Sequence, residues 1–128
     1  MDQRAKRCVR GRAAHHRGRA AEAQAESALQ REGWNVVARR LRTPAGEIDL
    51  VAEQGGLTAL IEVKSRPTLA GAAFALQPRQ QQRMIAAAQI ALADHPNWGR
   101  SGVRFDIMLV DAAGAVRRVA DAFRAEAV

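Results

Sequence analysis

Cysteine and aromatic residues are scarce in this sequence, and it contains no long hydrophobic run. Cys8 is the only cysteine among 128 residues, which excludes an internal disulfide and a disulfide-stapled scaffold. Tyrosine is absent and aromatic residues make up 4% of the chain, so any core must be largely aliphatic. No apolar segment reaches membrane-spanning length, and the basic N-terminus lacks the apolar stretch of a secretory signal. We therefore expect a cytoplasmic protein with no membrane partner.

Lysine is also scarce, and positive charge is distributed unevenly along the chain. The net charge is +7, and only two of the 20 basic residues are lysines. Residues 1–19 contain seven basic residues and one acidic residue, whereas residues 20–128 contain 13 basic and 12 acidic residues. We predict a basic, flexible arm over residues 1–17 that is attracted to nucleic acid phosphates, with a solubilising tail as the alternative. A single domain is predicted over residues 18–128.

The sequence beyond the arm predicts two helices and five strands. Alanine-rich residues from Arg19 to Glu32 favour a helix that Gly33 ends, and Pro78 opens a second helix that continues to Asp94. Residues 70–76 follow no clear pattern. Alternating hydrophobicity and turn residues predict strands at 35–41, 46–53, 57–66, 103–110 and 115–123. The order αβββαββ predicts an α/β fold in which helices flank a mixed central sheet of about five strands.

Acidic residues and one lysine gather on two neighbouring predicted strands. Glu47 and Asp49 share a face of one strand, and Glu62 and Lys64 share a face of the next. A Gln-Gly-Gly turn joins the strands, and either Asp49 or Glu47 lies opposite Glu62, depending on the register. Opposed carboxylates repel each other unless a cation lies between them, and Mg²⁺ prefers oxygen ligands of this kind. The pattern indicates a metal-dependent phosphodiesterase site, with Lys64 as a neighbouring cation.

Each of these charged groups also has a purely structural interpretation. Asp49, Glu62 and Lys64 would in that case form an ion-pair network that fixes the strand register. On the strand at 103–110, Arg104 and Asp106 alternate with apolar residues. We expect those two residues to form an ion pair on the exposed face of their strand.

Three motifs together resemble a known bacterial family. They are Gly-Glu-Ile-Asp-Leu-Val at 46–51, Ile-Glu-Val-Lys-Ser-Arg at 61–66 and Arg-Phe-Asp at 104–106. The sequence resembles the YraN-like uncharacterised bacterial protein family over about residues 18 to 123. That family resembles the PD-(D/E)xK superfamily, which includes restriction endonucleases and Holliday-junction resolvases. The resemblance implies a restriction endonuclease-like core and a nuclease, with branched or structured DNA as the first substrate to test.

The resemblance also implies roles for individual residues. Asp49 and Glu62 would be metal ligands for Mg²⁺ or Mn²⁺, together with the main-chain carbonyl of Val63, and Lys64 would be the catalytic lysine. Resolvase-type members add a glutamate from the first helix, and Glu22 matches it. Such members pair as two-fold dimers, so a homodimer is an arrangement to test.

Further residues are candidates for contact with nucleic acid, for which we favour DNA over RNA. Glu26 competes with Glu22 for the role of the helix glutamate. Arg66, Arg79, Gln80 and Arg83 are the predicted nucleic-acid-binding residues, although the same side chains would also suit a solvated surface. Two functional alternatives to a nuclease remain: an inactive nucleic-acid-binding module, and a subunit of a DNA-processing complex.

Overall fold

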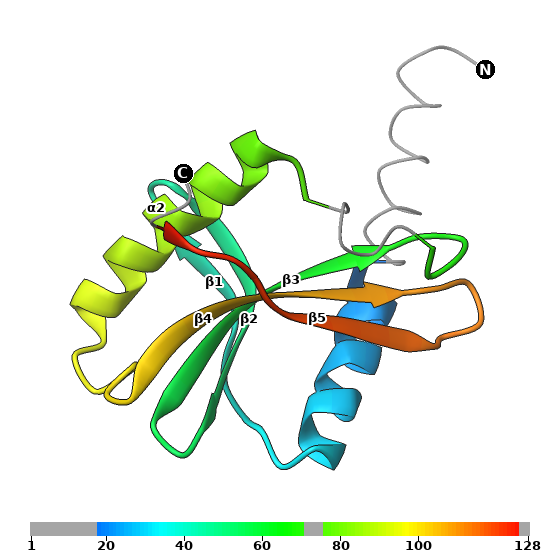
Figure 1. Cartoon of the computed structure of the whole chain (residues 1–128), viewed down its shortest axis with the longest axis horizontal. Helices are drawn as coiled ribbons and strands as arrows, with labels where there is room; N and C mark the ends of the chain where they lie inside the picture. Colours follow the sequence, from blue (N-terminus) through cyan, green and yellow to red (C-terminus); the bar gives the residue numbers. More distant parts are fainter. Residues whose placement is uncertain (1–17, 71–75, 126–128) are drawn as a thin grey trace.

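A five-stranded mixed sheet lies between two helices in the computed structural model, which describes residues 18–70 and 76–125 (Figure 1). The predicted order αβββαββ and the α/β class are confirmed. The predicted arm at 1–17 lies outside the described residues, as does most of the segment without a clear pattern. The elements are an N-terminal helix at residues 18–31, β1 (Asn35–Thr43), β2 (Gly46–Gln54), β3 (Leu57–Ser65), α2 (Pro78–Asp94), β4 (Gly102–Val110) and β5 (Val116–Phe123).

The strands lie in the order β1-β2-β3-β4-β5. Strands β3 and β4 are parallel and the other neighbours are antiparallel, so α2 forms the crossover that a parallel pair requires. Paired residues of β2 and β3 run from Gln54–Leu57 to Leu50–Ile61. This is the register that leads Asp49 towards Glu62, and the pairing ends just before those two residues.

Each face of the sheet carries its own aliphatic core, and the two helices cover opposite faces (Figure 1). Ala25 and Leu29 of the N-terminal helix pack on one face with Leu50 and Ile61, and Met108 belongs to the same cluster. The α2 face contains Met84, Ala87, Ala88, Ala91, Val51, Leu60 and Phe105. Within the described residues, no helix is long and apolar enough to cross a membrane.

Strict alternation along β2 fails at Ile48. Alternation would place Ile48 with Leu50 on the face of the N-terminal helix, yet Ile48 packs in the α2 cluster with Val51. The β2–β3 ladder ends at Leu50, whereas Ile48 stays paired with Leu41 of β1, so the break in alternation lies at Asp49, between these two residues. The two strands thus separate where the charged residues lie.

The Arg104–Asp106 ion pair is present, but its predicted place on an exposed face is wrong. Asp106 is fully buried, with an exposure of 0%. Its Oδ1 accepts from Nε of Arg104 (2.8 Å) and from the Asp121 N–H (2.9 Å), and its Oδ2 accepts from Nη2 of Arg104 (2.8 Å). These three hydrogen bonds offset the cost of desolvating the carboxylate, because they satisfy both of its oxygens.

Asp106→Ala is expected to lower the free energy of unfolding by about 3–5 kcal/mol, because it leaves the Arg104 guanidinium without its buried partner. Urea unfolding monitored by circular dichroism measures this change. Asp106→Asn serves as the matched variant, since it keeps the volume and the acceptor for Asp121 and should cost less. Equal unfolding midpoints for wild type and Asp106→Ala would contradict the expectation.

Candidate metal and catalytic site

Asp49 occupies the point where β2 leaves β3. The last registered pair of the two strands is Leu50–Ile61, so Asp49 lies just beyond the ladder with β3. Instead, the Val63 N–H donates to Oδ2 of Asp49 at 2.8 Å. The Asp49 side chain thereby serves as the acceptor for a strand N–H, which holds the carboxylate against β3.

The Asp49 carboxyl group lies in an environment that disfavours its charged form. Partial burial raises the pKa of Asp49 to about 7, and repulsion from Glu62 and Glu22 adds to the rise, whereas the Val63 N–H opposes it. Among the described residues, no basic side chain lies at ion-pair distance from Asp49. A desolvated carboxylate beside a second carboxylate is unfavourable unless a cation joins them.

Glu62 and Lys64 form the other half of the site. Nζ of Lys64 lies 3.1 Å from Oε1 of Glu62, and both side chains are 20% exposed. The expected ion pair is therefore present for these two residues, but it does not extend to Asp49. Glu62 also lines a cavity of about 140 Å³ between the strands and α2, together with Glu47 and Arg83.

The structure separates the two candidate glutamates of the N-terminal helix. Oε2 of Glu22 accepts from Nε of Arg40 at 2.8 Å, and the charge of Glu22 acts on Asp49. Glu26 lies one turn further along the helix and is held by Arg39, whose Nε is 2.9 Å from each of its oxygens. Glu22 is thus the helix glutamate that the fold brings towards Asp49.

The predicted nucleic-acid-binding residues fall into two groups. Gln80 and Arg83 line the small cavity that also contains Glu62. The Gln80 side chain accepts from the Gln77 N–H at 2.9 Å, so it also caps the start of α2. Arg66 and Arg79 are exposed and do not line that cavity, and Nη1 of Arg66 donates to the Ser65 carbonyl at 2.8 Å.

These donors suit a hard divalent cation. No three His, Cys, Asp or Glu side chains converge to form a complete metal cage in the part of the chain that the structure describes. Mg²⁺ does not require such a cage, because one or two carboxylates usually hold it while water and substrate oxygens complete its coordination. Asp49, which makes no ion pair among the described residues, and the nearby Glu62 fit that requirement.

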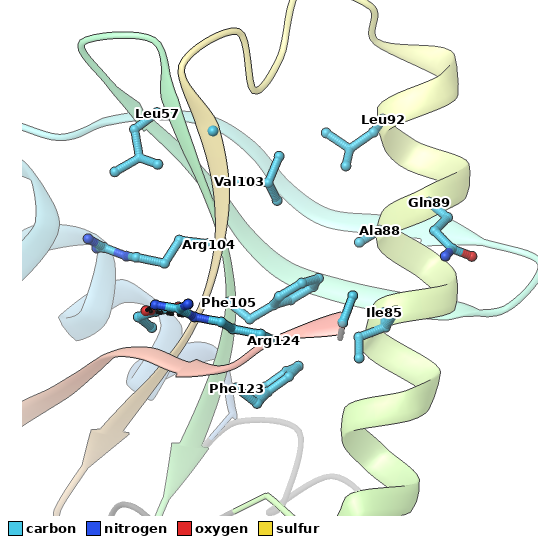
Figure 2. A pocket seen from close by; sticks show the side chains of 13 residues that line it. Leu57, Ile85, Ala88, Gln89, Leu92, Val103, Arg104, Phe105, Phe123 and Arg124 are labelled. Carbon is cyan, nitrogen blue, oxygen red and sulfur yellow. Dashed lines mark hydrogen bonds and ion pairs between the residues drawn. The ribbon is translucent and has the colours of Figure 1, made fainter. Parts of the chain in front are cut away.

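A larger cavity, of about 470 Å³, lies elsewhere, between α2 and the strands β4 and β5. Figure 2 shows Val103 and Phe105 facing Ile85 of α2 across it. Asp121 lines it but is already paired with Arg124, at 2.7 Å between Oδ2 and Nη2. This cavity is more spacious, but Asp121 is the single carboxylate among the described residues of its lining, so we place the candidate Mg²⁺ site at Asp49 and Glu62.

Comparison with known proteins identifies the family of this chain. The model of the Uncharacterised protein family UPF0102 matches residues 21–110, a span that contains both charged strands and α2. The chain belongs to the UPF0102 family. Membership of an uncharacterised bacterial family, predicted from the three motifs, is thereby confirmed.

Similar UPF0102 proteins cover most of the chain. One from Granulibacter bethesdensis is 56% identical over 119 residues, covering 93% of this chain and 75% of the relative. One from Azorhizobium caulinodans is 47% identical over 117 residues, covering 91% and 89%, respectively. One from Acidiphilium cryptum is 43% identical over 121 residues, covering 94% of each chain. These names give a family and no activity, so activity must be argued from the site.

One charged residue near the site of this UPF0102 protein was missed by the sequence analysis. Arg40 binds Glu22, although nothing in the local pattern separates Arg40 from Arg39 beside it. Arg40 has a backbone φ of +50°, a feature that hydrophobic periodicity does not reveal.

Proposed function

We propose that this protein is a divalent-metal-dependent nuclease that hydrolyses phosphodiester bonds, with DNA as its favoured substrate. The observation that carries the proposal is the half-buried Asp49 carboxyl group, which lies beside Glu62 and makes no ion pair with any basic residue that the structure describes. A structural ion-pair network would be expected to neutralise Asp49 as Lys64 neutralises Glu62. An uncompensated carboxylate at this point is better explained by a bound cation.

In this proposal, Asp49 and Glu62 hold Mg²⁺ or Mn²⁺, with the Val63 carbonyl as a further ligand and Glu22 as a supplement. The metal supplies Lewis acidity towards the phosphate and a bound water of lowered pKa. Lys64 lies next to Glu62, where its ammonium orients the attacking water or neutralises charge that develops on the phosphate.

Substrate binding in the proposal relies on phosphate contacts. Gln80 and Arg83 share a cavity with Glu62 and are placed to contact the nucleic acid backbone near the site. The exposed Arg66 and Arg79 would extend this contact beyond the cavity. Such contacts carry no base recognition, so we expect cleavage governed by the structure of the DNA and little dependence on its sequence.

A cleavage assay with the wild-type chain tests the proposal. End-labelled junction, flap, single-stranded and duplex DNA are incubated with Mg²⁺, Mn²⁺ or EDTA, and matched RNA substrates are run beside them. We expect cleavage with either metal, none in EDTA, and the highest rate on branched DNA. An Asp49→Asn preparation, purified identically, detects any contaminating nuclease.

Two results would contradict the nuclease proposal. Cleavage that persists in EDTA would remove the role of the metal. No cleavage of any substrate, with retained binding in a gel-shift assay, would replace the nuclease with a nucleic-acid-binding module.

A further inference from the structure

Arg40 lies level with Asp49 on the neighbouring strand. In the β1–β2 ladder, Arg39 pairs with Leu50 and Leu41 pairs with Ile48, so Arg40 and Asp49 occupy the position between these pairs. The β2–β3 register, continued one step beyond its last pair, places Asp49 opposite Glu62. A basic residue and two carboxylates therefore follow one another across three strands.

The backbone at Arg40 has an unusual conformation. Its φ is +50°, and it is one of two non-glycine residues with positive φ among those that the structure describes. Side chains other than glycine and asparagine rarely adopt this region, and they cluster at functional sites when they do. Position 40 nevertheless holds an arginine, a residue that this backbone conformation disfavours.

The Arg40 guanidinium faces the acidic cluster. Its Nε donates to Oε2 of Glu22 at 2.8 Å, with the two side chains 31% and 19% exposed, respectively. The hydrogen bond to Glu22 raises the pKa of Arg40, and the charges of Glu47 and Asp49 raise it further. Within the described residues, Oε1 of Glu22 has no hydrogen-bond partner.

We propose that Arg40 is a positioning residue that fixes Glu22 beside Asp49 by binding one oxygen of Glu22 and leaving the other free to accept from metal-bound water. The proposal rests on the metal site of the proposed function. Repulsion from Asp49 would otherwise drive Glu22 away, because the charges of these two carboxylates act on each other. Partners of this kind orient the groups around a metal and tune its affinity.

The competing role for Arg40 is direct contact with a substrate phosphate. That role would affect nucleic acid binding in the absence of metal and would leave metal affinity unchanged. The positioning role predicts the reverse, because Arg40 acts through Glu22. Metal affinity measured without nucleic acid therefore separates the two roles.

The test is a titration of the full-length protein with Mn²⁺ in the absence of nucleic acid. Binding is measured by calorimetry or from the electron paramagnetic resonance signal of free Mn²⁺. Arg40→Asn removes the guanidinium and places a residue that tolerates positive φ. We expect Arg40→Asn and Glu22→Gln each to weaken Mn²⁺ binding about tenfold. The double variant should bind Mn²⁺ no more weakly than either single variant. Arg40→Lys should bind Mn²⁺ more tightly than Arg40→Asn.

The neighbouring ion pair supplies a matched control. Arg39→Gln breaks the equivalent contact with Glu26, one helical turn away, and should leave Mn²⁺ affinity unchanged. Unchanged Mn²⁺ affinity in Arg40→Asn would overturn the inference, as would losses that multiply in the double variant. Weaker DNA binding in EDTA with unchanged Mn²⁺ affinity would assign Arg40 to phosphate contact. If wild type binds no Mn²⁺, the proposed metal site fails first and this inference fails with it.

Discussion

Asp49→Asn is expected to reduce the rate of metal-dependent cleavage by about 10³-fold or more. The same substitution is expected to stabilise the metal-free protein at alkaline pH. Asparagine keeps an acceptor for the Val63 N–H, so the local backbone contact survives. It removes the negative charge that would hold the metal. Loss of activity together with a gain in stability distinguishes a functional carboxylate from one that maintains the fold.

The pH dependence follows from the raised pKa of Asp49. That pKa is about 7 in the folded protein, against an ordinary value of 3.8. Between these values the folded state binds more protons than the unfolded chain, so stability falls as the pH rises from about 4 to 7. Above about pH 7, charged Asp49 destabilises the folded state, and we expect Asp49→Asn to be more stable than wild type by about 1–3 kcal/mol.

Urea unfolding in EDTA at about pH 4 and pH 8 measures this difference. The gain from Asp49→Asn should appear at pH 8 and largely disappear at pH 4, where Asp49 is protonated in the folded state and close to half protonated in the unfolded chain. The exposed Asp94 supplies a control, since Asp94→Asn makes the same change in net charge without altering the site. Addition of Mg²⁺ should stabilise wild type and not Asp49→Asn. A destabilised Asp49→Asn at pH 8 would show that the carboxylate is structural.

Lys64→Ala is expected to reduce cleavage by about 10²–10³-fold and to leave Mn²⁺ binding intact. Lys64 neutralises Glu62 in the metal-free protein, at 3.1 Å, and a bound cation can take over that part of its role. Charge stabilisation on the reacting phosphate cannot be replaced in this way. Single-turnover cleavage and Mn²⁺ titration, measured on the same preparation, test the two parts of this expectation.

Two further variants make the Lys64 experiment specific. Lys64→Arg keeps the charge but replaces a compact ammonium with a planar guanidinium, so we expect it to recover little activity. Arg42→Ala removes another cation that neighbours a carboxylate, since Arg42 pairs with Glu47 at 3.7 Å, but that arginine side chain is 89% exposed. We therefore expect Arg42→Ala to change the cleavage rate only slightly. Equal losses of cleavage and metal binding in Lys64→Ala would indicate a structural ion pair.

Much of the fold follows from local signals in the sequence. Alanine content and Gly33 locate the end of the first helix, and Gly33 indeed adopts a φ of +86°. Pro78 marks the first residue of α2. The period of two places Glu62 and Lys64 on one face of β3, and their ion pair agrees with that placement. These features depend on residues close together in the chain, so the sequence is sufficient to predict them.

The positions that depend on distant neighbours were decided only by the tertiary structure. Asp106 alternates with apolar residues as a solvated strand residue would, yet it is fully buried because Arg104 and the backbone of Asp121 satisfy its oxygens. The sequence leaves Glu26 as a competitor of Glu22, and only the packing of their helix on the sheet brings Glu22 towards Asp49.

By itself the sequence determined the α/β class, the order of elements and the placement of Glu62 and Lys64 on one face of β3. Packing decided which charged residues pair: Glu62 with Lys64 and Glu22 with Arg40, whereas Asp49 forms no ion pair within residues 18–70 and 76–125. The physical reason is that periodicity sets the direction of a side chain, whereas burial and charge compensation depend on groups brought close by folding.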